Sequence, residues 1–334
     1  MVNKTMLKDD QKLHSEIFSD EPSVAYTRTG YGDGLVEVGH ENENVIAVCA
    51  DLAESTRTHL FKNEFPDRYV EVGVAEQNLA TVGSGLAAVG KIPFISSYAA
   101  FSPGRNNEQI RTTISINNVS VKIVGAHAGI SVGPDGATHQ QLEDIALMRA
   151  QPNMKVIVPA DYEEARKTVH LAVDLDGPVY FRLAREKTPV ITTADSPFEF
   201  GKANILWESA EPEVALIACG PLVHNALVAA KQLEDEGVGT IVVNNHTIKP
   251  MDEATIIAVA KRCGAVVTVE EHQVAAGMGS AVAEILAQNA PTPQEFIGVH
   301  DRFGQSGTPE QLIEEYGMDV GSIVKAVKKV RERK

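Results

Sequence analysis

Glu76 is an acidic residue in an apolar setting, within the stretch VEVGVAEQNLATVGSGLAA at residues 70–88. A short apolar run ends just before it, and small residues and glycines follow in a pattern typical of a helix. Burial penalises the charged form of a carboxyl, so an acid in this setting needs a partner. Glu76 is therefore either a salt-bridged or exposed residue at a helix start, or a buried acid that hydrogen-bonds a ring nitrogen of a cofactor.

A second stretch, HAGISVGPDGATHQ at residues 127–140, places two imidazoles and a carboxylate on a Gly/Pro-rich loop. Pro-Asp-Gly is a common turn signal, so an ordinary turn would explain Asp135 alone. It does not explain His127 eight residues before that aspartate and His139 four residues after it. This constellation favours the interpretation of Glu76 as a cofactor-binding acid.

Together, the two stretches resemble the pyrimidine-binding half of thiamine diphosphate enzymes, and the transketolase group in particular. The resemblance runs from about residue 25 to the end, and it matches only the second half of a full-length transketolase. It implies that Glu76, within GVAEQN, is the activating catalytic acid. A carboxyl hydrogen-bonded to N1′ of thiamine diphosphate favours the imino tautomer, which can remove the weakly acidic thiazolium proton.

The resemblance also implies which other side chains touch the cofactor. Tyr98 and Phe101, in PFISSYAAFSPGR, would by themselves be ordinary core residues. They match positions that supply the ring stacked on the aminopyrimidine. Asp51 resembles a contact to the cofactor or to the dimer partner. Arg105 stays open, because this sequence has one extra residue before it.

The loop at residues 127–140 resembles the part of transketolases that lines the substrate channel. The resemblance implies that His127 contacts the reacting end of the substrate or its phosphate, and that it takes part in catalysis. It implies that Asp135 binds a sugar hydroxyl. His139 would hydrogen-bond near the cofactor or the phosphate.

Three scattered residues match the family's phosphate-binding positions: Arg28 in AYTRTG, Ser55 in CADLAEST and Arg185 in FRLARE. Each would be an ordinary surface residue by itself. Arginine suits this task because its guanidinium forks onto two phosphate oxygens. Arg182, three residues before Arg185, is expected to support the site.

A GDG sequence at residues 32–34 invites comparison with the motif by which thiamine diphosphate enzymes hold magnesium and diphosphate. That motif follows a strand and is completed downstream by an Asn pair. Here no strand precedes it, and the downstream window offers only Asn63. We therefore predict a turn or helix start at residues 32–34 and a magnesium motif that lies on another chain.

Apolar runs of four to six residues alternate with helical periods along the chain. This rhythm is typical of an α/β fold with a doubly wound parallel sheet, in which ligands sit at the carboxyl ends of the strands. Asp51, Glu76 and His127 all fall at such ends. We predict an N-terminal arm or docking helix at 1–22, a pyrimidine-binding domain at 23–190, a linker at 191–207 and a smaller α/β domain at 208–334. A helix is predicted at 103–117.

The second domain carries TIKPMD, VVTVEEH and GMGSAVAE, which resemble the C-terminal domain shared by transketolases and 2-oxo-acid dehydrogenase beta subunits. Its His246, Glu270 and His272 are interpreted as structural or interface residues. The closing segment DRFGQSGTPEQLIEEYGMD resembles transketolase specifically.

Composition excludes several classes of function. A net charge of −15 argues against a nucleic-acid or anionic-membrane surface, although a few arginines suffice for a phosphorylated substrate. Cys49, Cys219 and Cys263 are widely spaced, which favours reduced thiols in a cytoplasmic protein. No apolar run approaches the length of a membrane span, and no signal-like segment opens the chain.

The main hypothesis is the C-terminal subunit of a split transketolase, which moves a two-carbon ketol unit from xylulose 5-phosphate to ribose 5-phosphate. The N-terminal partner subunit would supply the magnesium and diphosphate site, in a heterotetramer with a two-fold axis. The alternatives are a 1-deoxyxylulose-5-phosphate synthase fragment, a 2-oxo-acid dehydrogenase beta subunit and a non-catalytic scaffold partner. Arg28 and Ser55 favour transketolase over the beta subunit, whose substrate carries no sugar phosphate.

Overall fold

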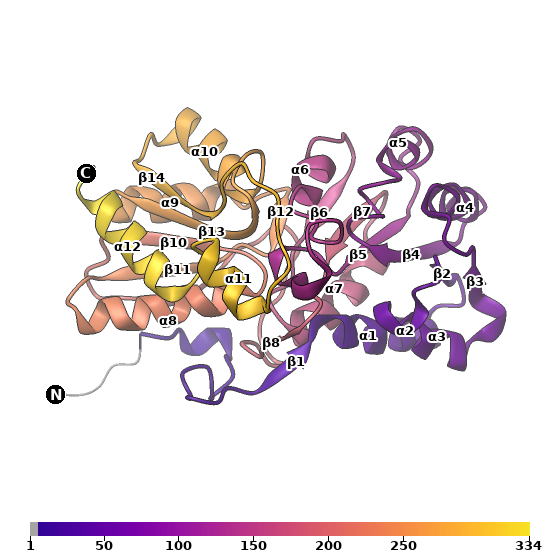
Figure 1. Ribbon diagram of the computed structural model, residues 1–334, viewed down its shortest axis with the longest axis horizontal. Coiled ribbons are helices and arrows are strands. Elements are labelled where there is room, and N and C mark those ends of the chain that lie inside the picture. Colours follow the sequence, from indigo (N-terminus) through magenta and orange to yellow (C-terminus); the bar gives the residue numbers. More distant parts are fainter. Residues whose placement is uncertain (1–5) are drawn as a thin grey trace.

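The computed structural model describes residues 6–334, which form two α/β units side by side (Figure 1). The first is built on a seven-stranded sheet with the strand order β12-β6-β7-β5-β4-β2-β3. All neighbouring strands in it are parallel except β12 and β6. Its strands are β2 (Val45–Cys49), β3 (Tyr69–Glu71), β4 (Ile92–Tyr98), β5 (Lys122–Ala126), β6 (Lys155–Ile157), β7 (Val179–Arg182) and β12 (Thr247–Lys249).

Helices cover both faces of this sheet, because its central strands are apolar on both sides. One face packs against α1 (Thr27–Glu41), α3 (Thr58–Glu64) and α7 (Tyr162–Asp174). The other packs against α4 (Glu76–Ala88), η3 (Ile110–Ser115) and α6 (Asp144–Arg149). The short elements are η1 (Asp9–Gln11), α2 (Ala53–Thr56), η2 (Pro66–Arg68), α5 (Asn107–Gln109) and η4 (Ile130–Asp135). The predicted doubly wound parallel sheet is confirmed.

The second unit contains a five-stranded sheet with the order β14-β13-β10-β11-β9, parallel except for the edge strand β9. Its strands are β9 (Asn204–Glu208), β10 (Val214–Ala218), β11 (Thr240–Asn244), β13 (Val266–Gln273) and β14 (Gln294–Val299). Its helices are α8 (Leu222–Asp235), α9 (Glu253–Cys263), α10 (Met278–Asn289), α11 (Pro309–Glu315) and α12 (Val320–Arg331). One hydrophobic cluster runs from α4 and α6 of the first unit into α9 and α10 of the second.

The segment from residue 6 to residue 22 lies against the second unit rather than the first. The Lys8 backbone N–H donates to the Leu206 carbonyl at 3.0 Å, and the Phe18 ring meets Trp207 edge-on at 5.9 Å. Its one helical turn is η1, so this part of the predicted arm docks without a regular α-helix; its first five residues lie outside the described part. A two-stranded antiparallel sheet, β1 (Val24–Tyr26) with β8 (Lys187–Pro189), follows it.

Three sequence predictions are wrong in detail. Residues 103–117 do not form one helix, but turns followed by α5 and the wider-wound η3. The predicted linker runs four residues too far, because β9 begins at Asn204. The GDG sequence lies inside α1, neither in a turn nor at a helix start. No helix in residues 6–334 is long and apolar enough to cross a membrane.

Candidate active site

Glu76 is the first residue of α4, directly after the loop that leaves β3. Its side chain is only 2% exposed, and its Oε2 lies 3.0 Å from Nη1 of Arg105. The Asn106 side-chain amide donates to the Glu76 carbonyl at 2.8 Å, which ties the start of α4 to the turn after β4. Glu76 is therefore both buried and salt-bridged, and Arg105, whose role the sequence left open, is its charged partner.

Four aromatic rings connect this acid to the loop at residues 127–140. Arg105 lies 4.8 Å over the centroid of the Phe101 ring, which in turn meets the His139 ring at 5.3 Å. Tyr98, the last residue of β4, stacks on Phe101 at 6.1 Å and on His127 at 3.9 Å. Five of the sequence-predicted residues, Glu76, Tyr98, Phe101, His127 and His139, thus form one continuous cluster.

His127 follows the carboxyl end of β5 and has a left-handed backbone, with φ of 54°. Burial, together with the nearby positive charges of Arg28 and Arg185, lowers the pKa of His127 to about 3. The imidazole is therefore neutral at neutral pH. Its buried Nδ1 has no hydrogen-bond partner among residues 6–334.

The candidate phosphate-binding residues form two pairs near His127. Nη1 of Arg28 donates to the Ser55 carbonyl at 3.0 Å, and burial lowers the pKa of Arg28. Nη2 of Arg185 lies 3.7 Å from Oδ1 of Asp135, and another nitrogen of the same guanidinium donates to the Val132 carbonyl. Two cations from distant parts of the chain therefore flank a neutral imidazole, which suits a mono- or dianionic ligand group.

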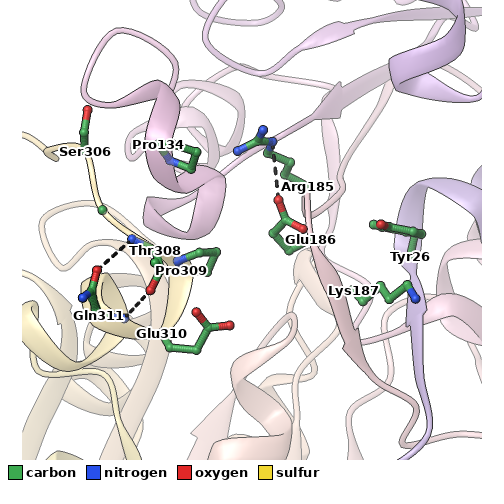
Figure 2. Close-up of a pocket in the computed structure, with 11 residues that line it drawn as sticks. Tyr26, Pro134, Arg185, Glu186, Lys187, Ser306, Thr308, Pro309, Glu310 and Gln311 are labelled. Atoms are coloured by element: carbon green, nitrogen blue, oxygen red, sulfur yellow. Dashed lines mark hydrogen bonds and ion pairs between the residues drawn. The ribbon is translucent and has the colours of Figure 1, made fainter.

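Arg185 also lines an open cleft of about 750 Å³ between the two units. In Figure 2 the first unit contributes Tyr26, Pro134, Glu186 and Lys187 to this cleft, and the second contributes residues 306–311. No local sequence pattern predicts that residues 306–311 approach the site. The sequence evidence for these residues was that the closing segment resembles transketolase, and this resemblance does not predict where the segment lies in the structure.

Asp51 is not drawn into the cluster. It is exposed and follows β2 with a φ of 59°, and its backbone N–H donates to a Glu71 carboxylate oxygen at 2.8 Å. Within residues 6–334 its side chain makes no hydrogen bond or ion pair. Asp51 therefore presents its carboxylate outward from the carboxyl edge of the sheet, where another chain could meet it.

Arg182 is buried and structural. Its Nε lies 2.9 Å from Oδ2 of Asp144, and its Nη1 donates to the Glu271 carbonyl of the second unit at 3.1 Å. This side chain ties the two units together.

Three residues of the second unit that could act as acids or bases, Glu270, His272 and His246, also make structural contacts. Glu270 accepts the backbone N–H groups of Met278 and Gly279 at the start of α10. His272 accepts from the Ala146 N–H at 3.4 Å, while its other ring nitrogen lies 2.7 Å from the Gln273 carbonyl. His246 is fully buried, and its ring lies 4.2 Å from the Phe198 ring at a tilt of 30°.

Comparisons with known proteins agree with this geometry. Residues 24–190 match the family described as transketolase, pyrimidine binding domain, and residues 201–323 match the transketolase, C-terminal domain. The chain is 43% identical to a transketolase C-terminal section from Methanocaldococcus jannaschii, over 90% of this chain and 94% of that protein. It is 39% identical to the 6-deoxy-6-sulfo-D-fructose transketolase subunit SqwH of a Clostridium species, over 92% and 95% of the two chains.

A solved structure described as a split gene transketolase, inactive beta4 tetramer, superimposes with a TM-score of 0.86 at 45% identity. The match covers 92% of this chain and 98% of that one. The chain matches both family domains in this order. It also covers nearly the full length of three related chains that are named as a section, a subunit or a split-gene product. The chain belongs to the transketolase family and corresponds to its C-terminal part, a pyrimidine-binding domain followed by the C-terminal domain.

Proposed function

We propose that this chain is the C-terminal subunit of a split transketolase, which transfers a two-carbon ketol unit from a ketose phosphate to an aldose phosphate. The observation that carries the proposal is the continuous cluster that begins at the buried Glu76 carboxyl. It passes through the rings of Phe101 and Tyr98 and ends at His127 between two arginines.

The cluster fits the aminopyrimidine end of thiamine diphosphate. A buried carboxyl beside half-buried aromatic rings offers both a ring-nitrogen partner and a stacking face. In this proposal Glu76 holds the ring nitrogen, Tyr98 and Phe101 hold the ring face, and His139 lies at the edge. Asp51 meets the cofactor or the partner chain. When bound, thiamine diphosphate supplies the nucleophilic carbon and the electron sink for breaking a carbon–carbon bond.

The chain's own polar groups would hold the sugar. Arg28, the segment at Ser55 and Arg185 take the phosphate, because two guanidinium groups can each fork onto its oxygens. Asp135 accepts from a sugar hydroxyl once its ion pair with Arg185 is shared with the substrate. His127 is neutral, so it contacts the substrate's reacting end by a hydrogen bond from its unpartnered Nδ1 and not by a positive charge.

The GDG sequence at residues 32–34, the candidate for the magnesium and diphosphate motif, lies inside α1 and lacks the downstream Asn pair. Among residues 6–334 there is no group of three or more His, Cys, Asp or Glu residues that could hold a metal ion. We therefore assign the Mg²⁺ ligands to an N-terminal partner subunit. The similar split transketolase is described as inactive in its beta4 form, which supports this division of labour.

Xylulose 5-phosphate and ribose 5-phosphate are the proposed donor and acceptor. The relative named for 6-deoxy-6-sulfo-D-fructose carries in its name a substrate with a sulfo group, another anionic tail. An arginine pair can bind a phosphate or a sulfo group, so the same two residues suit a sugar with either anionic tail.

The test is reconstitution. The purified chain is assayed alone and then with its N-terminal partner, thiamine diphosphate and Mg²⁺, with xylulose 5-phosphate and ribose 5-phosphate as substrates. We expect ketol transfer only in the complete mixture. Robust turnover by the chain alone would refute the proposal, and acyl transfer from a 2-oxo acid to lipoamide would assign the beta-subunit alternative instead.

A further inference from the structure

The loop at residues 127–140, called here the substrate loop, has little regular structure of its own. Between β5 and α6 it forms only the short turn η4, which is broken at Gly133, where φ is 78°. Yet it carries His127, Asp135 and His139. A loop of this kind keeps one conformation only if its polar backbone groups are held from outside.

Two contacts hold the loop in place, and the first hold comes from β13 of the second unit. The Glu271 side chain is 4% exposed, and its Oε1 accepts the backbone N–H of Ser131 at 2.6 Å. Gly129, with φ of 94°, lies so close that a Cβ there would be 2.3 Å from the same carboxylate oxygen. The start of η4 is therefore pinned against Glu271.

The second hold is Gln140, which is 4% exposed at the end of the loop. Its Nε2 lies within hydrogen-bond distance of three carbonyl oxygens: Ile130 at 3.0 Å, Gly133 at 3.2 Å and Gln305 at 2.9 Å. The first two belong to the loop and the third to the second unit. A Cβ on Gly304 would lie 1.8 Å from Oε1 of Gln140, so there is no room for the amide to move.

We propose that Gln140 and Glu271 are positioning residues through which the C-terminal domain sets the geometry of the substrate loop. This inference rests on the proposed function for the substrate contacts of His127 and Asp135, but not for the hold itself. The C-terminal domain then has a part in substrate binding without touching the substrate.

The hold is tested first on the chain alone, by hydrogen exchange of peptides that cover residues 127–141. Gln140→Met removes the donor at similar volume, and Gly304→Ala displaces the same amide from the opposite side. Both variants should exchange faster in this loop, by about tenfold, because a buried hydrogen bond is lost. Gly321→Ala in α12 is the control, since its Cβ would meet nothing closer than 3.4 Å. Unchanged exchange in both variants would overturn the proposal.

The consequence is tested in the reconstituted complex. Gln140→Met should raise KM for the sugar phosphate several-fold more than it lowers kcat, because the loop positions the substrate. Glu271→Gln keeps an acceptor for the Ser131 N–H, so its KM should stay near that of the wild type. Glu271→Met lacks this acceptor, so its KM should rise. Faster exchange with an unchanged KM would overturn the positioning role. A wild-type complex without ketol transfer would instead refute the proposed function, and the exchange result would still stand.

Discussion

Glu76 combines a feature of each interpretation that the sequence left open, because it is salt-bridged and also buried. The sequence left a choice between a salt-bridged helix-start acid and a buried cofactor acid, and the structure has a buried carboxyl at a helix start, paired with Arg105. Arg105 is itself 49% exposed, so its guanidinium can return to water at small cost. The pair keeps the carboxyl satisfied in the free chain, and it can open when a ring nitrogen takes its place.

Glu76→Gln should remove most ketol transfer in the reconstituted complex, by roughly 10²–10⁴-fold, because a proton partner of the cofactor is lost. Proton exchange at the thiazolium carbon, followed by NMR, should slow as well. The exposed Glu253→Gln at the start of α9 is the control. Exchange at the wild-type rate in Glu76→Gln would show that Glu76 is not the activating acid.

Arg28→Ala and Arg185→Ala should mainly raise KM for phosphorylated sugars, by about tenfold or more, since each removes a charge-assisted hydrogen bond. Unphosphorylated hydroxypyruvate should be affected much less. Steady-state kinetics with both substrates make this comparison, and equal losses on both would mean that the two arginines serve the fold.

At the scale of elements, apolar runs predicted the strands well, because a parallel strand buried on both faces leaves a clear run of four to six apolar residues. Helix α1 was missed because glycines at positions 30, 32 and 34 imitate a turn. These glycines instead allow close helix contact: a Cβ on Gly30 would lie 2.1 Å from the Tyr162 carbonyl oxygen of α7. The approach of residues 304–311 to the substrate loop depends on packing between units, which no local pattern encodes.

Gly30→Ala should therefore destabilise the chain by at least ~1–3 kcal/mol, because overpacking must push α1 away from α7. Urea unfolding measures the loss. Gly85→Ala in α4 is the matched control: nothing lies within 4 Å of its Cβ, and alanine should stabilise that helix by up to ~1 kcal/mol. Since Arg28 lies on α1, KM for the sugar phosphate should also rise in Gly30→Ala. Equal stability of the two variants would contradict the close-packing argument.

At the scale of the whole molecule, the two units are joined by extensive contacts. Strand β12, which belongs to the second unit by sequence, completes the edge of the first sheet beside β6. The hydrogen bond from Arg182 to the Glu271 carbonyl and the shared hydrophobic cluster join the two units. Two parts of the candidate region stay open to solvent: Asp51 is exposed, and the cleft beside Arg185 is open.

This arrangement predicts weak cofactor binding by the chain alone. In the proposed function, Glu76, Tyr98 and Phe101 contact only the aminopyrimidine end, and residues 6–334 contain no group of three or more His, Cys, Asp or Glu residues that could hold the magnesium ion at the diphosphate end. Calorimetry should give an affinity for thiamine diphosphate at least about a hundredfold weaker than that of the complex with the N-terminal subunit, since the charge-assisted contacts to the diphosphate are missing. Omitting Mg²⁺ should change the affinity of the lone chain little, but that of the complex greatly. Tight, magnesium-dependent binding by the chain alone would mean that it holds a complete site and that no partner is needed.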